Sequence, residues 1–198
     1  MNSVDSRESK SVRVRIARRE DAEKITTVIN SAFRAAEEFF VEGDRVDVGE
    51  VLNFLSSGKF LLAESDGMLL GCVYVESLMG KRGTGKGESQ HPGPTLSSAQ
   101  SEDRAYLGLL AVDPAHQQSG LGSKLMDAAE DYCRGLGHKF IDIKVVHLRE
   151  GLFGFYRTRG YVETGTSAFP AEVATRVPCH FIDMSKSLNE DKATQSGN

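Results

Sequence analysis

The stretch "QQSGLG", residues 117–122, places the strongest limit on what this chain can fold into. It lies between the apolar run "YLGLLAV" (106–112) and "SKLMDAAEDYC" (123–133), whose apolar residues recur at helical spacing. The pattern predicts a strand, a glycine-rich turn and an amphipathic helix. A helix leaves backbone N–H groups without partners at its positive end, and glycine lets a ligand approach them closely. The sequence therefore predicts a phosphate site at this turn.

Three kinds of phosphate site use such a turn. A nucleotide P-loop requires GxxxxGK[ST], and here Gly122 is followed by Ser-Lys in the wrong order. A dinucleotide site requires GxGxxG, but Leu125 stands at the third glycine, and we interpret Asp142, placed where that fold keeps a ribose-binding acid, as a coincidence. The third kind pairs a pyrophosphate at the helix with an amide-rich arm along a strand that splays from its neighbour. That combination describes coenzyme A.

The rest of the chain predicts one mixed α/β (α+β) domain with a mostly antiparallel sheet of about seven strands and about four helices. The turn "SDG" between two apolar runs is a hairpin signal, and Gly108 is a candidate bulge. We expect disordered tails at 1–11 and 188–198, a domain at 12–187 and a Gly/Pro-rich loop at 80–103. Strands are expected at 12–16, 59–64, 68–77, 104–112, 139–146, 161–166 and 179–185, and helices at 17–33, 46–55, 121–136 and 152–160.

Bulk properties exclude several classes of protein. The formal net charge of −4 argues against nucleic-acid binding. The polar start predicts no secretory signal, and no apolar run is long enough for a membrane helix, so we expect no membrane partner. The cysteines Cys72, Cys133 and Cys179 lie in apolar segments without metal-ligand spacing. They predict reduced core thiols, a cytoplasmic protein and no metal site.

The segment "LLAVDPAHQQSGLGSKLMDAAEDYC" resembles the signature of the GNAT superfamily of N-acetyltransferases, Q/R-x-x-G-x-G/A behind a strand ending in V-x-P. Gln117, Gly120 and Gly122 occupy its fixed positions, and "FYRTRGY" (155–161) is similar to a second family element. The resemblance implies a single GNAT-like domain and direct transfer of acetyl from acetyl-CoA, the cosubstrate, to an amine. The family also suggests a homodimer as the assembly.

The resemblance further assigns roles to individual residues. It implies that the backbone N–H of Leu110 stabilises the charge that develops on the thioester oxygen. It also implies that Tyr156 protonates the departing thiolate, although helical spacing alone favours a core aromatic there. Many members keep an asparagine seven residues before this tyrosine; Arg149 holds that spacing here, and we favour His147 as the replacement. The residues expected to bind the coenzyme are Leu110, Ala111, Val112, Gln117, Gln118, Ser119, Gly120, Leu121, Gly122, Ser123 and His147.

The acceptor and the general base are not fixed by the sequence. Glu76, Glu102 and Asp103 are candidate bases, and the alternative interpretation of each is an ordinary charged side chain exposed to solvent. The segment 37–50 carries six acidic residues against one arginine, which would attract a cationic amine. A small amine, an amino acid, a peptide N-terminus and a lysine side chain all remain open. A second hypothesis is a non-catalytic acyl-CoA-binding sensor or scaffold with the same fold.

Overall fold

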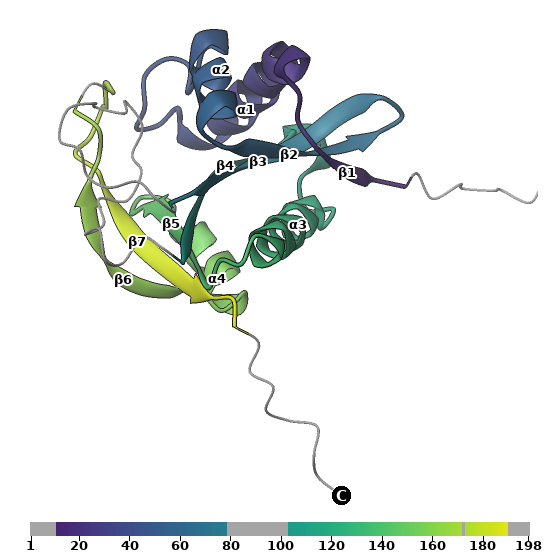
Figure 1. Ribbon diagram of the computed structural model, residues 1–198. Helices are drawn as coiled ribbons and strands as arrows, with labels where there is room; N and C mark the ends of the chain where they lie inside the picture. The colour runs from purple at the N-terminus through teal and green to yellow at the C-terminus, as the bar shows by residue number, and fades with distance from the viewer. Residues whose placement is uncertain (1–10, 79–102, 172, 190–198) are drawn as a thin grey trace, which may run out of the picture.

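The computed structural model describes residues 11–78, 103–171 and 173–189, so the predicted tails and the predicted loop at 80–103 lie almost wholly outside the described residues. Within them the chain forms seven strands and four α-helices, which confirms the predicted fold class (Figure 1). The strands are β1 Arg13–Ile16, β2 Lys59–Ser65, β3 Met68–Ser77, β4 Arg104–Val112, β5 Phe140–Val146, β6 Val162–Ala168 and β7 His180–Ser187. The helices are α1 Ala22–Glu37, α2 Val48–Ser57, α3 Leu121–Gly135 and α4 Glu150–Thr158, with 3-10 turns at Arg19–Asp21 and Pro114–His116.

The strands form one sheet in the order β1-β2-β3-β4-β5-β7-β6. Every neighbouring pair is antiparallel except β4 and β5, which are parallel and are joined through α3. Between β2 and β3 the predicted Asp-Gly turn is confirmed: Asp66 and Gly67 have φ values of 52° and 75°. Positive φ at both residues matches the twist of a two-residue hairpin, which fixes the register of these strands.

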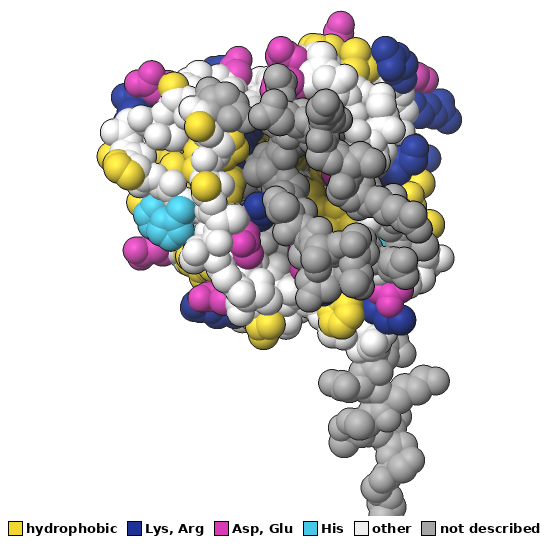
Figure 2. Space-filling model, turned by 60° about the vertical axis from the view of Figure 1, so that its left-hand side comes forward, with side chains coloured by type: hydrophobic (Ala, Val, Ile, Leu, Met, Phe, Trp, Pro, Cys, Tyr) yellow, Lys and Arg dark blue, Asp and Glu magenta, His cyan; other side chains and the backbone are white. Residues whose placement is uncertain are grey.

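Helices cover both faces of the sheet, α1 and α2 on one side and α3 and α4 on the other (Figure 1). Because both faces are buried, the central strands alternate between two apolar cores. Leu61 and Val73 pack in the core beneath α3, whereas Leu62 and Cys72 pack in the core beneath α1. On the part of the face in Figure 2 that is drawn in colour, acidic and basic side chains lie mostly around the rim, and hydrophobic side chains lie inside it.

An ion-pair network fastens α1 to the edge of the sheet. Arg15 on β1 donates to both oxygens of Asp21, at 2.8 Å each, and to Glu64 on β2 at 2.6 Å. Asp21 also accepts from the backbone N–H of Arg18 at 2.7 Å, at the turn that leads into α1. These bonds to the ionised form lower the pKa of Asp21 from 3.8 to about 2.

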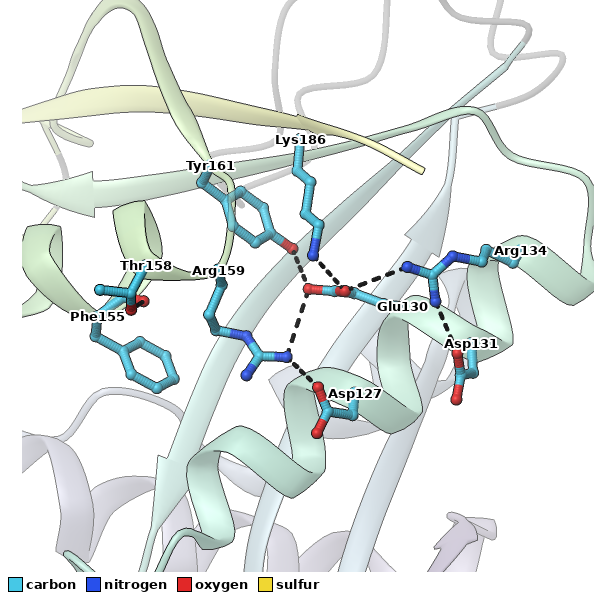
Figure 3. Close-up of polar contacts among 9 residues, drawn as sticks. All are labelled: Asp127, Glu130, Asp131, Arg134, Phe155, Thr158, Arg159, Tyr161 and Lys186. Carbon is cyan, nitrogen blue, oxygen red and sulfur yellow. Dashed lines mark hydrogen bonds and ion pairs between the residues drawn. The ribbon is translucent and has the colours of Figure 1, made fainter. Parts of the chain in front are cut away.

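A second charged cluster joins α3 to the segment after α4 and to β7 (Figure 3). Glu130 on α3 is only 3% exposed, and Lys186 on β7 donates to its Oε2 at 2.6 Å. Arg134 lies 3.5 Å and Arg159 3.7 Å from its carboxylate, and the Tyr161 hydroxyl donates to Oε1 at 3.5 Å. Because Arg159 and Tyr161 follow α4 directly, the cluster fixes where α4 packs.

The described residues continue two positions beyond the predicted domain boundary at 187. Leu188 is 4% exposed and packs in the core beneath α3. Its backbone N–H donates to the carbonyl of Lys139 at 2.7 Å. Within the described stretches, no helix is both long and apolar enough to cross a membrane.

Candidate active site

The strand before the glycine turn is distorted where the site begins. Gly108 and Ala111 on β4 pair with Tyr74 and Cys72 on β3, so two β4 residues lie opposite the single residue Val73. The extra residue makes a bulge at 109–110, where Leu109 has a φ of 48°. The predicted bulge is therefore present, one position after Gly108.

β4 also separates from β5 at this point. The two strands pair only from Arg104 to Tyr106 on β4, opposite Phe140 to Asp142 on β5. Beyond Tyr106, the edge of β4 that faces β5 has no ladder partner. The sheet is thus open between its two halves, and the predicted splay is confirmed. Backbone N–H and C=O groups along this edge can bind the amides of a ligand.

The turn after β4 is held by its own polar groups. Asp113 Oδ1 accepts from the backbone N–H of Ala115 at 2.8 Å, and the Ser119 hydroxyl donates to the carbonyl of His116 at 2.6 Å. The Gln117 side chain donates back to the carbonyl of Val112 at 3.3 Å. The turn therefore starts next to the end of the strand, and Gln117 connects the two.

Gly120 supplies the backbone conformation that starts α3. Its φ of 80° lies in the left-handed region, and it caps the helix without any side-chain hydrogen bond. Among the described residues, the backbone N–H groups of Leu121, Gly122 and Ser123 form no hydrogen bond, whereas Lys124 donates to the Gly120 carbonyl at 3.0 Å. Three N–H groups at the positive end of a 15-residue helix are therefore available to an anion.

One cavity of about 390 Å³ extends from this helix end into the open part of the sheet. Its lining residues come from the glycine turn, the bulged half of β4, β5, α4 and the far side of the molecule at α1 and α2. Those from the turn and from β4 are Tyr106, Leu107, Gly108, Leu109, Leu110, Val112, Gln117 and Gly122. A single cavity thus runs from the free helix amides past the bulge to α1.

Tyr156 on α4 also lines this cavity. It is 7% exposed and packs edge-on against Tyr161 with ring centroids 5.7 Å apart. Burial raises the pKa of its phenol to about 12, while Arg149 and Arg159 act in the opposite direction. Tyr156 is therefore protonated at neutral pH and can donate a proton into the cavity.

The structure brings some of the predicted site residues to the cavity and leaves others at its edge. Leu110, Val112, Gln117, Gly122 and Tyr156 line it. The lining does not include Ala111, Gln118, Ser119, Gly120, Leu121, Ser123 and His147. Most of these belong to the turn at the mouth of the cavity, where their backbone rather than their side chains would meet a ligand.

His147 is engaged elsewhere. Its ring stacks on that of His180 with centroids 4.0 Å apart, and its Nδ1 accepts from the backbone N–H of His180 at 3.2 Å. Arg149, the residue that holds the spacing of the family's asparagine, does line the cavity. Asp142 has an internal partner, because Arg104 Nε donates to its Oδ2 at 2.6 Å.

Neither of the two predicted bases that the structure describes lines the cavity. Glu102 lies outside the described residues, and Asp103 forms an ion pair with Lys139 at 2.5 Å at the start of β4. Glu76 stands opposite Tyr106 in the β3–β4 register and does not line the cavity. The carboxylates that do line it are Glu37 and Glu50, which the sequence grouped with a surface acidic segment.

Glu37 is the last residue of α1 and only 5% exposed. Its Oε1 accepts from Arg149 at 3.1 Å, whereas its buried Oε2 has no hydrogen-bond partner among the described residues. Burial raises the pKa of this carboxyl, and Arg45 and Arg149 partly offset the effect. The described residues contain no cluster of three or more His, Cys, Asp and Glu placed to hold a metal ion.

Comparison with known proteins agrees with this geometry. A family model described as "Acetyltransferase (GNAT) family" matches residues 16–161. The fold is similar to an N-acetyltransferase from Staphylococcus aureus Mu50, with 14% identity and a TM-score of 0.67, covering 90% of this chain and 99% of that one. The ribosomal-protein-S18-alanine N-acetyltransferase from Escherichia coli is 13% identical, with a TM-score of 0.61 and 94% and 100% of the two chains covered.

A Salmonella typhimurium protein, described as an acetyltransferase and solved with its cofactor acetyl-CoA, is similar as well. It is 19% identical, with a TM-score of 0.66, and the match covers 94% of this chain and 99% of that one. At these identities the likeness shows the fold alone. No curated protein matches the sequence.

Proposed function

The chain belongs to the acetyltransferase (GNAT) family, a family of acyltransferases, and from this premise we propose that it transfers the acetyl group of acetyl-CoA directly to a primary amine. One observation carries the proposal: free helix amides, an open strand edge and a buried, protonated tyrosine all meet in one cavity. These are the groups that a pyrophosphate, an amide-rich arm and a departing thiolate require.

The residues present fit the coenzyme along its length. In this proposal, Gln117 to Ser123 hold the pyrophosphate through their backbone N–H groups at the positive end of α3. The edge of β4 from Leu110 to Val112 binds the pantetheine amides, since β5 leaves that edge without a ladder partner. Lining by apolar residues of β4 and β5 keeps water from the thioester.

Two residues act on the reacting group. The backbone N–H of Leu110, re-aimed by the bulge, stabilises the negative charge that develops on the thioester oxygen. Tyr156 donates its proton to the sulfur as the C–S bond breaks. Burial of the thiolate in the same cavity raises its own proton affinity, which favours this transfer even from a phenol with a pKa of about 12. We further propose the cytoplasm as the compartment, where free thiols such as Cys72 and Cys133 are typical.

Ligand-dependent melting and thiol release test the proposal together. A ligand at about 100 times its Kd stabilises a protein by about 2.7 kcal/mol, a shift easily seen in the melting temperature. We expect acetyl-CoA and CoA to raise it, ATP and NAD to leave it unchanged, and a panel of amines to release free CoA. Stabilisation by ATP or NAD would contradict the proposal. Acetyl-CoA binding without thiol release from any amine would favour the sensor or scaffold hypothesis.

A further inference from the structure

The end of the cavity away from α3 is lined by α1 and by the segment that follows it. Glu37 lines this end, with one carboxylate oxygen held by Arg149 and the other, Oε2, buried without a partner in the part of the chain that the structure describes. A buried carboxylate oxygen that lacks a donor is costly, because it has lost water and gained nothing in return. Because Glu37 belongs to the cavity lining, a donor on a ligand that reaches its carboxylate would supply the missing bond.

Arg45 lines the same end of the cavity, and its backbone is fixed. Asn30 on α1 accepts from the N–H groups of Arg45 and Val46 at 3.0 Å each and donates to the Val46 carbonyl at 2.8 Å. The guanidinium of Arg45 lies 5.4 Å from the ring centroid of Phe33 and 5.8 Å from that of Phe169. Two aromatic rings therefore hold this cation in place before any ligand arrives.

The other charged groups of the lining already have partners. Glu50 is used in the capping box of α2, where it accepts from the Asp47 N–H at 2.7 Å. Lys144 lies 4.0 Å from Asp183, and Arg149 donates to Glu37. Among the described residues, Arg45 forms no ion pair. Within the described part of the chain, one carboxylate oxygen of Glu37 and the cation of Arg45 are thus without a hydrogen-bonded or ion-paired partner.

We propose that the acceptor is a small primary amine that also bears a carboxylate, the chemistry of an amino acid. The Glu37 carboxylate receives the amine, and the guanidinium of Arg45 binds the carboxylate of the acceptor. A guanidinium binds a carboxylate in a bidentate manner, so the pair selects a zwitterion over a simple amine. This assignment rests on the proposed function, because it names the acceptor of that same cavity.

The proposed transfer step conserves atoms and charge. The ammonium of the acceptor gives one proton to Glu37, and the resulting amine attacks the thioester carbonyl. The C–N bond forms and the C–S bond breaks, the sulfur takes a proton from Tyr156, and the nitrogen loses its second proton to solvent. Tyr156 and Glu37 return to their starting states by exchange with solvent, so the net reaction releases CoA, the amide and one proton.

Matched acceptors test the assignment on the unmodified protein. Free CoA release is measured for the common L-amino acids, for the amines that lack only their carboxylate, and for their carboxamides. We expect kcat/KM for the best amino acid to exceed that of its decarboxylated amine and its carboxamide by about 100-fold. Equal rates for the three forms, or acetyl-CoA binding without turnover of any amino acid, would overturn the assignment.

Substitutions at Arg45 and at Glu37 test the roles of these two residues separately. Arg45→Gln should raise KM for the amino acid by about 30-fold or more, leave the decarboxylated amine unchanged, and be partly rescued by Arg45→Lys. Glu37→Gln should lower kcat by about 100-fold for both forms while the Kd for acetyl-CoA stays the same. The matched controls are Arg34→Gln and Glu38→Gln, exposed residues of the same region, which should behave as the unmodified protein.

The outcomes distinguish the two levels of the proposal. If Arg45→Gln weakens both acceptors equally, or Glu37→Gln keeps full kcat, the acceptor assignment is wrong while the acetyltransferase stands. If the protein binds no acetyl-CoA and releases no thiol with any amine, the proposed function itself fails. Melting temperatures report whether each variant folds, and where one does not, the comparison of matched acceptors on the unmodified protein decides.

Discussion

At the scale of single residues, burial gives two ordinary side chains in this cavity unusual proton affinities. It raises the pKa of Tyr156 to about 12 and that of Glu37 above its ordinary value of 4.5. The phenol is thereby kept as a proton donor, and the carboxylate is made a stronger base than a surface glutamate. Both effects come from desolvation, and nearby arginines moderate both.

Tyr156→Phe tests the donor. Without the phenol the thiolate must leave unprotonated, so kcat should fall by about 100- to 10,000-fold, while the Kd for acetyl-CoA changes little. Steady-state CoA release and a binding titration measure the two quantities. Tyr132→Phe, a tyrosine on α3 outside the cavity lining, is the control. A variant that keeps its kcat would show that Tyr156 only fills space.

The pH dependence of the rate tests Glu37. A base with a raised pKa loses activity as the pH falls through a value above 4.5, because the protonated carboxyl cannot accept a proton. The charged and titratable groups that face it are Arg149 from the start of α4, Arg45 after α1, and Cys179 before β7. We expect kcat/KM of the unmodified protein to fall at low pH in this way, and kcat/KM of Glu37→Gln to show no such fall. An unchanged fall in the variant would mean that another group titrates.

Stability depends on pH through Asp21. Its folded pKa of about 2 lies below its ordinary 3.8, so the stabilisation is present above that value and is lost as the pH falls towards about 2. The difference is worth about 2 kcal/mol at pH 7. Urea unfolding should show Asp21→Asn destabilised by that amount at pH 7 and much less near pH 2.5. Glu20→Gln changes an exposed neighbouring residue and should alter the free energy of unfolding little. A loss of stability in Asp21→Asn that does not depend on pH would contradict this explanation.

At the scale of elements, the strands and helices could be predicted because each is encoded locally. Apolar periodicity predicted β4 and α3, and the Asp-Gly pair predicted the hairpin, which shows the positive φ values such a turn requires. The bulge could be placed only to within one residue, since its position depends on the pairing with β3. Burial of Glu37 gave no local signal, because its partner Arg149 is 112 positions away along the chain.

The way α4 is fastened to α3 gives a prediction at the same scale. In Glu130→Gln, Lys186 and Arg159 would keep their charges, 18% and 14% exposed, without the carboxylate between them (Figure 3). Breaking such a pair should cost about 3 kcal/mol in the free energy of unfolding, measured in urea. Asp131→Asn, on the same helix but 75% exposed, should cost less than about 1 kcal/mol. Equal effects from the two variants would show that the cluster does not fasten α4.

At the scale of the whole molecule, the sheet is two halves that share only a short ladder between β4 and β5. In the proposed function, a ligand lying between the halves would replace the missing ladder with its own amides and would meet the free end of α3 with its phosphates. This arrangement would let a turn, a bulge and a tyrosine that are far apart in sequence act on one molecule. The central claim is therefore that the turn binds the pyrophosphate of acetyl-CoA.

Calorimetric titration of acetyl-CoA into the unmodified protein and into Gly122→Glu tests that claim most directly. The nearest atom to a new Cβ at Gly122 is 4.0 Å away, and glutamate near a helix N-terminus favours the helix, so the variant should fold at least as stably. Its carboxylate would repel a pyrophosphate, so affinity should fall by about 100-fold or more, while Gly122→Ala retains binding. Equal affinity in Gly122→Glu, or no binding by the unmodified protein, would contradict the account.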